Sequence, residues 1–174
     1  MTIQTVLRMG HPDLLKVADV VTEFNTEQLQ TLITDMYDTM NSMNGAGLAA
    51  PQIGVSKRVV IFCVDANPRY PDVESVPDTI LINPQITFLS QQQESDWEGC
   101  LSVPGLRGLV PRCNKIEYSG YDLEGKQILR TAEGFHARVV QHEVDHLDGI
   151  LYPQRMADLA TLGYEDVLFP DADA

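Results

Sequence analysis

Several features that mark common classes of protein are scarce in this sequence. It contains three cysteines, an odd number for a disulfide framework, and Cys63 and Cys113 lie in apolar surroundings. We therefore expect a reducing, cytoplasm-like compartment. A membrane-spanning helix needs about 18 apolar residues in a row, and no such run occurs. The N-terminal segment also lacks the basic start and apolar stretch that are typical of a secretory signal.

Basic residues are scarce as well. The 12 lysines and arginines are outnumbered by 25 aspartates and glutamates, which gives a formal net charge of −13. A surface of this sign repels phosphate backbones and anionic lipids, so we expect no direct nucleic-acid binding and no membrane association. The C-terminal stretch from Leu162 to Ala174 is acidic too. This argues against electrostatic docking on RNA through the tail.

The residues that are present suit a globular protein. With 174 residues, 44% of them hydrophobic, the chain is expected to form a single domain over residues 1–174. Apolar residues recur at spacings of three and four from Thr26 to Met43, which predicts a helix, and Asn25 with Gln28 suggests a capping box at its start. A second helix is predicted from Glu133 to Asp148, ending at Gly149.

Between the two helices the sequence is rich in short β-type segments separated by turns. Asp122-Leu123-Glu124-Gly125 is typical of a hairpin turn, and the proline-containing stretch from Asn67 to Pro77 predicts a surface loop. A helix, several mostly antiparallel strands and another helix predict an α+β domain. The predicted strands are Val59–Val64, Thr79–Asn83, Ile86–Leu89, Lys115–Tyr121 and Gln127–Arg130.

The second predicted helix carries the most informative segment, Gln141-His142-Glu143-Val144-Asp145-His146. Histidines four residues apart project about 40° apart on a helix, so both imidazoles can bind one ion, as in the HExxH motif. On a helical wheel His142, Glu143 and His146 fall on or within the apolar arc. Burying ionisable groups without partners is costly, so we favour a metal ion between them over two structural core histidines.

A catalytic metal site of this kind needs a third protein ligand and an open position. One zinc-protease pattern supplies a third histidine six residues after the second, but Tyr152 occupies that place here. Another pattern uses a glutamate further downstream, and Glu165 lies 19 residues after His146. Cys100 lies between a glycine and a small polar stretch, where we expect a loop. From the residues alone, three possibilities stay open. The third ligand is Glu165, or it is Cys100, or Cys100 is an inert buried thiol.

Three separated segments resemble the signature motifs of the peptide deformylases. They are Gly45-Ala46-Gly47-Leu48-Ala49-Ala50-Pro51-Gln52, Glu98-Gly99-Cys100-Leu101-Ser102 and Gln141-His142-Glu143-Val144-Asp145-His146-Leu147. Met9-Gly10-His11-Pro12 also resembles the N-terminal segment of that family, and Arg107 follows the cysteine motif where the family has an arginine. The resemblance covers the chain from Val6 to about Met156, and three motifs in order at the family's spacing are highly specific.

The resemblance implies an enzyme that removes the formyl group from the N-terminal formyl-methionine of newly made polypeptides and releases formate. Glu143 would be the general acid and base, while the side-chain amide of Gln52 and the backbone N–H of Leu101 would stabilise the oxyanion. The family typically uses Fe(II) in the cell, with Ni, Co or Zn as substitutes, and the sequence cannot choose among them. The resemblance implies one divalent metal ion per chain, held by Cys100, His142 and His146.

A peptide-binding site is implied as well. Gly47 and Gly99 would lie along the substrate backbone, because a bare backbone lets a peptide approach closely. Arg138 is expected either near the mouth of the methionine pocket or as a solvated arginine. Arg107 would either meet the substrate or serve as a structural ion-pair partner. The wall of the methionine pocket is expected to comprise Ala46, Phe135 and Val139.

The fold implied by the resemblance is α+β, with antiparallel sheets packed around a central C-terminal helix that carries HExxH. We expect a monomer in a bacterial cytoplasm, acting on formyl-methionyl nascent peptides. Two other functions stay open. A zinc endopeptidase would use Glu165 as its third ligand, and a non-catalytic metal-binding domain would keep the ligands without needing Glu143.

Overall fold

The computed structural model describes residues 2–64 and 75–170. Its three α-helices are α1 (Glu27–Ser42), α2 (Gly134–Leu147) and the single turn α3 (Glu165–Leu168). Short 3₁₀ helices are η1 (Pro12–Leu15), η2 (Ala50–Ile53), η3 (Tyr152–Arg155) and η4 (Leu159–Thr161). The strands are β1 (Gly47–Ala49), β2 (Val59–Val64), β3 (Val76–Phe88), β4 (Gln93–Cys100), β5 (Val103–Cys113), β6 (Lys115–Tyr121), β7 (Gln127–Glu133) and β8 (Gly163–Tyr164).

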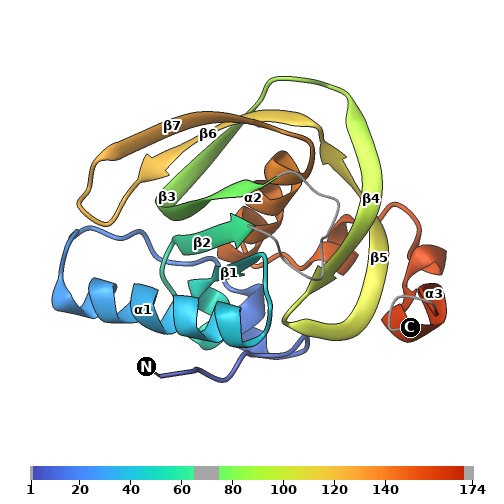
Figure 1. Cartoon of the computed structure of the whole chain (residues 1–174), viewed down its shortest axis with the longest axis horizontal. Helices are drawn as coiled ribbons and strands as arrows, with labels where there is room; N and C mark the ends of the chain where they lie inside the picture. The colour runs from blue at the N-terminus through green and yellow to red at the C-terminus, as the bar shows by residue number, and fades with distance from the viewer. Residues whose placement is uncertain (1, 65–74, 171–174) are drawn as a thin grey trace.

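The strands form two antiparallel sheets around α2. One sheet has the order β1-β2-β3-β6-β7 and the other the order β4-β5-β8. Figure 1 shows the long β4–β5 hairpin curving past one side of α2, while the larger sheet covers another side and α1 lies outside β1 and β2. The predicted α+β fold with antiparallel sheets packed around the HExxH helix is therefore confirmed.

Both main helices match their predicted ranges to within one residue at each end. The predicted capping box at the start of α1 is wrong, however. Thr26 is the N-cap, and its hydroxyl accepts a hydrogen bond from the backbone N–H of Leu29 at 3.2 Å. Asn25 precedes the cap with a left-handed backbone (φ 54°), and its side chain accepts from Gln30 instead. Threonine is a good N-cap residue, because its hydroxyl oxygen can accept a hydrogen bond from a backbone N–H in the first turn of the helix.

The strand predictions are correct for β2 and β6 and incomplete elsewhere. The two runs predicted around Asn83 form one strand, β3, whose pairing with β6 shifts register between Ile82 and Gln85. Asn83 takes a left-handed conformation (φ 51°) there, so the strand bends without ending. The predicted loop from Asn67 to Pro77 falls largely on residues 65–74, outside the described residues, and its last part belongs to β3.

Helix α2 is buried on nearly every side. Its apolar side chains, including Val140 and Leu147, are fully covered within the core beneath the larger sheet. The polar side is buried as well, because Arg138, Gln141 and Asp145 face the β4–β5 hairpin and are only 7–8% exposed. The helix thus holds ionisable side chains away from water, where each requires a partner. Within the described ranges, no helix is long and apolar enough to cross a bilayer.

Candidate active site

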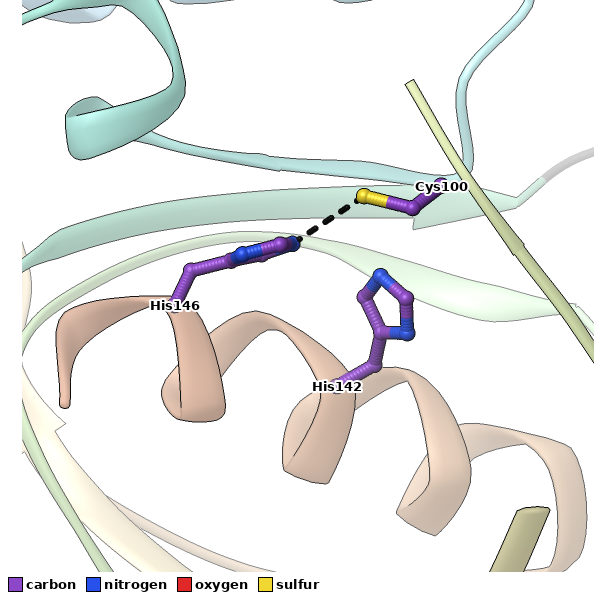
Figure 2. Close-up of side chains that lie close together, drawn as sticks. All are labelled: Cys100, His142 and His146. Atoms are coloured by element: carbon purple, nitrogen blue, oxygen red, sulfur yellow. Dashed lines mark hydrogen bonds between the residues drawn. The ribbon is translucent and has the colours of Figure 1, made fainter. Parts of the chain in front are cut away.

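Three potential metal ligands converge at one point between α2 and the end of β4. The ligand atoms of Cys100, His142 and His146 all lie within 4.8 Å of one another. Figure 2 shows the two imidazoles rising from successive turns of α2 toward the Cys100 sulfur, which approaches from the opposite side. The Sγ atom of Cys100 is 3.3 Å from Nε2 of His146. One ion placed among these atoms would touch all three residues.

Cys100 lies at the last position of β4, so the prediction of a loop is wrong. The chain reverses immediately after it, and Cys100 pairs with Val103 at the tip of the β4–β5 hairpin. The sulfur accepts hydrogen bonds at 3.4 Å from Nε2 of Gln52 and from the backbone N–H of Ser102. Cys100 is only partly buried and has polar contacts on several sides, so the geometry does not favour an inert core thiol.

Glu165, the alternative third ligand, is engaged elsewhere. Its carboxylate accepts from Nε and Nη2 of Arg107 at 2.9 and 2.5 Å. It is absent from the ligand cluster found among the described residues. The geometry therefore favours Cys100 over Glu165 and removes the structural basis for a glutamate-ligated endopeptidase.

Glu143 lies beside the cluster, and its side chain is buried and closely surrounded by other atoms. The residue is 5% exposed, and its Oε2 atom has no hydrogen-bond partner within the described part of the chain. Its carboxyl group lies against the Cα atom of Gly47 on β1. Burial is the main cause that raises the pKa of Glu143 to about 7. Such a carboxyl group can both take up and release a proton near neutral pH.

Gln52 is held so that its amide nitrogen faces the cluster. Its Oε1 accepts from the backbone N–H of Ala49, and its Nε2 donates to Ser102 Oγ at 3.1 Å as well as to the Cys100 sulfur. These bonds fix the orientation of a side chain that is only 2% exposed. Leu101 follows Cys100 at the hairpin tip and lines the same cavity.

A cavity opens between the β1 edge, the end of β4 and the first turns of α2. It brings together most of the residues that the sequence predicted for the site. Two predicted residues are not in its wall: His146, which is 2% exposed, and Arg107, which lies directly behind Gly99. Trp97, which the sequence did not place in the site, also lines the cavity. The predicted residues in the wall are Ala46, Gly47, Gln52, Gly99, Cys100, Leu101, Phe135, Arg138, Val139, His142 and Glu143.

Glu98 is an important residue that the sequence reasoning missed. Its carboxylate contacts Nδ1 of His142 at 2.8 Å and accepts from Arg112 at 2.9 and 3.1 Å and from Arg138 at 2.8 Å. Burial alone would raise the pKa of Glu98, but the hydrogen bonds and charges of His142 and Arg112 outweigh it and hold that pKa well below its usual range. A carboxylate on Nδ1 leaves Nε2 as the nitrogen of His142 that can face a metal.

The same network of ion pairs explains the buried polar side of α2. Besides Glu98, Arg112 pairs with Asp145, with 2.5 Å between Nη1 and Oδ2, and Oδ1 of Asp145 accepts from Nη2 of Arg155 at 2.7 Å. Arg138 donates to Glu98 and to the carbonyl oxygens of Val110 and Glu94, so it is no solvated arginine. Arg112 and Arg138 are buried while Arg155 is half exposed. The available signal in the sequence was the presence of charged residues such as Glu98 and Arg138 within or beside the motifs, since charges that become buried there need partners.

The donor set fits a divalent metal ion. A cysteine sulfur and two histidine nitrogens suit several first-row ions and leave one position open in a tetrahedral arrangement. The Glu98–His142 contact is the kind of outer interaction that orients a ligating imidazole. A Cys/His/His cluster, a buried carboxyl group beside it and a cavity leading to both define a hydrolytic enzyme.

Comparisons with known proteins identify which hydrolase family this is. Residues 3–161 match the sequence profile described as polypeptide deformylase. The chain is 62% identical to peptide deformylase 1 of Nitrosomonas europaea over 168 residues, which are 97% of this chain and 96% of that protein. It is 58% identical to peptide deformylase 2 of Ralstonia nicotianae over 172 residues, 99% of this chain and 97% of that protein.

Solved structures of peptide deformylases also resemble this chain. A crystal structure of the class I type b peptide deformylase from Acinetobacter baumannii bound to K4U matches with a TM-score of 0.86 at 40% identity, covering 90% of this chain and all of that one. The same Acinetobacter enzyme bound to Met-Ala-Ser also gives 0.86 at 40% identity, covering 89% and 99% of the two chains. The chain belongs to the peptide deformylase family and is an enzyme.

Proposed function

We propose that the protein is a metal-dependent hydrolase that removes the formyl group from the N-terminal formyl-methionine of newly synthesised polypeptides. The observation that carries the proposal is the convergence of three potential ligand atoms within 4.8 Å beside a buried carboxyl oxygen that has no hydrogen-bond partner among the described residues. Family membership supports the substrate class. We also propose that the chain forms a single catalytic domain and acts as a monomer in a bacterial cytoplasm.

Cys100, His142 and His146 would hold one divalent metal ion, with Fe(II) as the proposed cellular ion and Ni, Co or Zn as substitutes. Such an ion lowers the pKa of a water molecule toward neutrality and polarises a carbonyl group. Glu98 holds His142 through Nδ1 and keeps its other nitrogen directed to the cluster. His146 has no such carboxylate: its Nδ1 is buried without a hydrogen-bond partner among the described residues, and its ring packs edge-on against His142 with centroids 5.1 Å apart.

Glu143 would move the proton. Its pKa of about 7 lets the carboxylate accept a proton from the attacking water and then deliver it to the amine that leaves with the peptide. The confined position against Gly47 keeps the carboxyl group facing the cluster. Because its Oε2 atom has no partner among the described residues, no existing hydrogen bond must break before the transfer.

Gln52 and Leu101 would stabilise the negative charge on the formyl oxygen. The amide of Gln52 is already oriented by Ala49 and Ser102, so its N–H groups need little rearrangement. The backbone N–H of Leu101 would be the second donor. Removing one donor of this kind typically lowers the rate roughly a hundredfold.

The cavity would hold the peptide that carries the formyl group. The Acinetobacter relative is known with Met-Ala-Ser bound, and we propose that the present cavity takes an equivalent peptide. Gly47 and Gly99 would lie along its backbone, with Arg107 and Arg138 near its path. The apolar wall for the methionine side chain would comprise Ala46, Phe135 and Val139.

The test is formate release from formyl-Met-Ala-Ser by protein purified without oxygen and loaded with Fe(II) or Ni(II). We expect formate, no cleavage of an internal peptide bond in an acetylated peptide, and loss of both metal and activity in Cys100→Ala. Glu165→Ala should retain metal. Internal cleavage that depends on Glu165 would instead support the endopeptidase, and metal binding without formate would support a binding domain.

A further inference from the structure

The C-terminal segment of the described chain lies against the outer side of the proposed peptide site. Strand β8 pairs with β5, with Gly163 opposite Arg107 and Tyr164 opposite Leu106. The short helix α3 follows at once, and Figure 1 shows it beside β5, away from α1. This segment therefore reaches the site along β5.

Arg107 connects this segment to the cavity wall. A Cβ atom built on Gly99 would lie 3.0 Å from Cδ, Nε and Cζ of Arg107, so the guanidinium group stacks directly on the Gly99 backbone. Gly99 itself lines the cavity, next to Cys100. A peptide that leaves the metal site along Gly99 thus passes a cation. The Arg107 side chain is 8% exposed.

Glu165 forms an ion pair with Arg107 and so neutralises its charge. Two hydrogen bonds from Arg107 to Glu165, at 2.9 and 2.5 Å, end on the same oxygen, Oε1. The Glu165 side chain remains 40% exposed, so the carboxylate also contributes negative potential to the nearby solvent. A contact at the end of the segment holds it in place, because the rings of Phe169 and Trp97 meet edge to face with centroids 5.2 Å apart. Trp97 is part of the cavity wall.

The pairing of Arg107 with Glu165 affects how well the site binds peptides of different charge. An arginine behind the cavity wall that lacked a carboxylate partner would attract a carboxylate of the peptide, whether a C-terminal one or an acidic side chain. With Glu165 bound, the local charge is close to zero and the chain as a whole carries −13. A negative group on the peptide then gains little from Arg107 and is repelled by the rest of the surface.

We propose that Glu165 sets the charge preference of the peptide site: by neutralising Arg107 behind Gly99, it makes the site discriminate against peptides with negative charge near the formylated end. This inference rests on the proposed function. Glu165 acts through Arg107, and it is a specificity-determining residue with no part in the chemical step.

The experiment compares formylated peptides of two to four residues, each as the free C-terminal acid and as the amide. Each added residue extends a peptide by about 3.3–3.6 Å, so the series moves the carboxylate along the site. In Glu165→Gln, which keeps an acceptor for Arg107, the KM for the acid should fall about fivefold at one length or more. The KM for the matching amide and both kcat values should stay near those of the wild type. High salt should reduce the difference.

Two further variants control for folding and for general charge. Glu165→Asp keeps the charge and should keep the wild-type ratio of acid to amide KM. Asp166→Asn removes an equal charge from an exposed neighbour on the same helix and should also leave the ratio unchanged. Thermal unfolding of each variant verifies that the segment stays folded.

The outcomes separate this inference from the proposed function. Formate release with an unchanged ratio in Glu165→Gln at every length overturns the inference alone, as does an equal shift in Asp166→Asn. No formate from either form of the peptide, with any variant, overturns the proposed function and this inference together.

Discussion

Gly47 and Glu143 face each other so closely that no side chain fits between them. A Cβ atom on Gly47 would lie 2.7 Å from Cδ and 2.8 Å from Cγ of Glu143, closer than real Cβ contacts occur. The Gly47 backbone is not in the left-handed region, so alanine is excluded by this contact and not by its own backbone preference. Because Gly47 has no side chain, the carboxyl group of Glu143 can occupy this position.

Gly47→Ala should therefore impair catalysis through Glu143. The added methyl must displace the carboxyl group, so we expect kcat to fall at least about tenfold, with metal content unchanged. Steady-state formate release with metal analysis of the same samples tests this. Gly45→Ala is the comparison, because its Cβ would meet Leu101 Cδ1 at 3.0 Å, Met40 Cγ at 3.2 Å and the Gly47 carbonyl oxygen at 3.3 Å, which is a milder overlap that does not involve Glu143. An equal loss in both variants would contradict the specific role of Gly47.

Glu98→Gln should weaken metal binding. The amide cannot hold the imidazole of His142 as a carboxylate does, and loss of such a partner typically costs about 10–100-fold in metal affinity. Competition with a chelator of known affinity measures the change. Glu94→Gln, on the same strand and exposed, is the matched control. Unchanged metal affinity in Glu98→Gln would show that His142 does not depend on this contact.

The same variant should change the response of stability to acid. The pKa of Glu98 is lower in the folded chain than in the unfolded one, so the folded state binds its proton less tightly. The stabilisation is then present above the unfolded pKa of about 4.3 and is lost as the pH falls through and below it. Unfolding in urea at several pH values should show a shallower acid decline in Glu98→Gln than in the wild type. Parallel declines would contradict this.

The metal-free protein should show the opposite dependence for Glu143. Its folded pKa, about 7, lies above the ordinary value of 4.5, so the folded state binds the proton more tightly. The corresponding stability is present below about pH 4.5 and is lost as the pH rises through 7. Glu143→Gln should therefore gain stability relative to the wild type across this window, by an amount on the order of 2 kcal/mol. A constant difference between the two proteins from pH 4.5 to 7.5 would argue against a raised pKa.

Arg112 should contribute far more to stability than a comparable surface arginine. It pairs with both Glu98 and Asp145 while its side chain is 6% exposed. Removing one partner of a buried ion pair typically costs about 3–5 kcal/mol. Arg58, whose side chain is 16% exposed, pairs with Asp148, whose side chain is 46% exposed, so this pair should contribute closer to what exposed pairs contribute, about 0.2–1 kcal/mol. Urea unfolding of Arg112→Leu and Arg58→Leu should reproduce this order, and equal losses would contradict it.

Local periodicity was enough to predict the parts of the site that lie on one helix. His142 and His146 project together because their spacing matches the helical repeat, and the range predicted for α2 was correct to one residue at each end. The strands β2 and β6 were found for a similar reason, since each is a compact run of β-forming residues. These features depend only on neighbours in the chain.

The remaining parts depend on contacts between distant segments. Strand β4 begins Gln93-Glu94-Ser95-Asp96, and β5 contains two glycines and two prolines, so neither has the composition of a strand. Their pairing nevertheless carries Cys100 to the helix. The burial of Arg138 and Asp145 likewise follows from arginine–carboxylate pairs across the hairpin, which a helical wheel cannot show. The proposed third ligand was therefore suggested by the resemblance, and the fold brings it to the two histidines.

The most direct test of the whole account is to measure bound metal and formate release in the same samples of the wild type and of Glu143→Gln. Both proteins should bind one metal ion per chain, because Cys100, His142 and His146 are unchanged. Only the wild type should release formate from formyl-Met-Ala-Ser at a substantial rate, since glutamine cannot carry the proton. Wild-type rates in a metal-loaded Glu143→Gln protein would contradict the account.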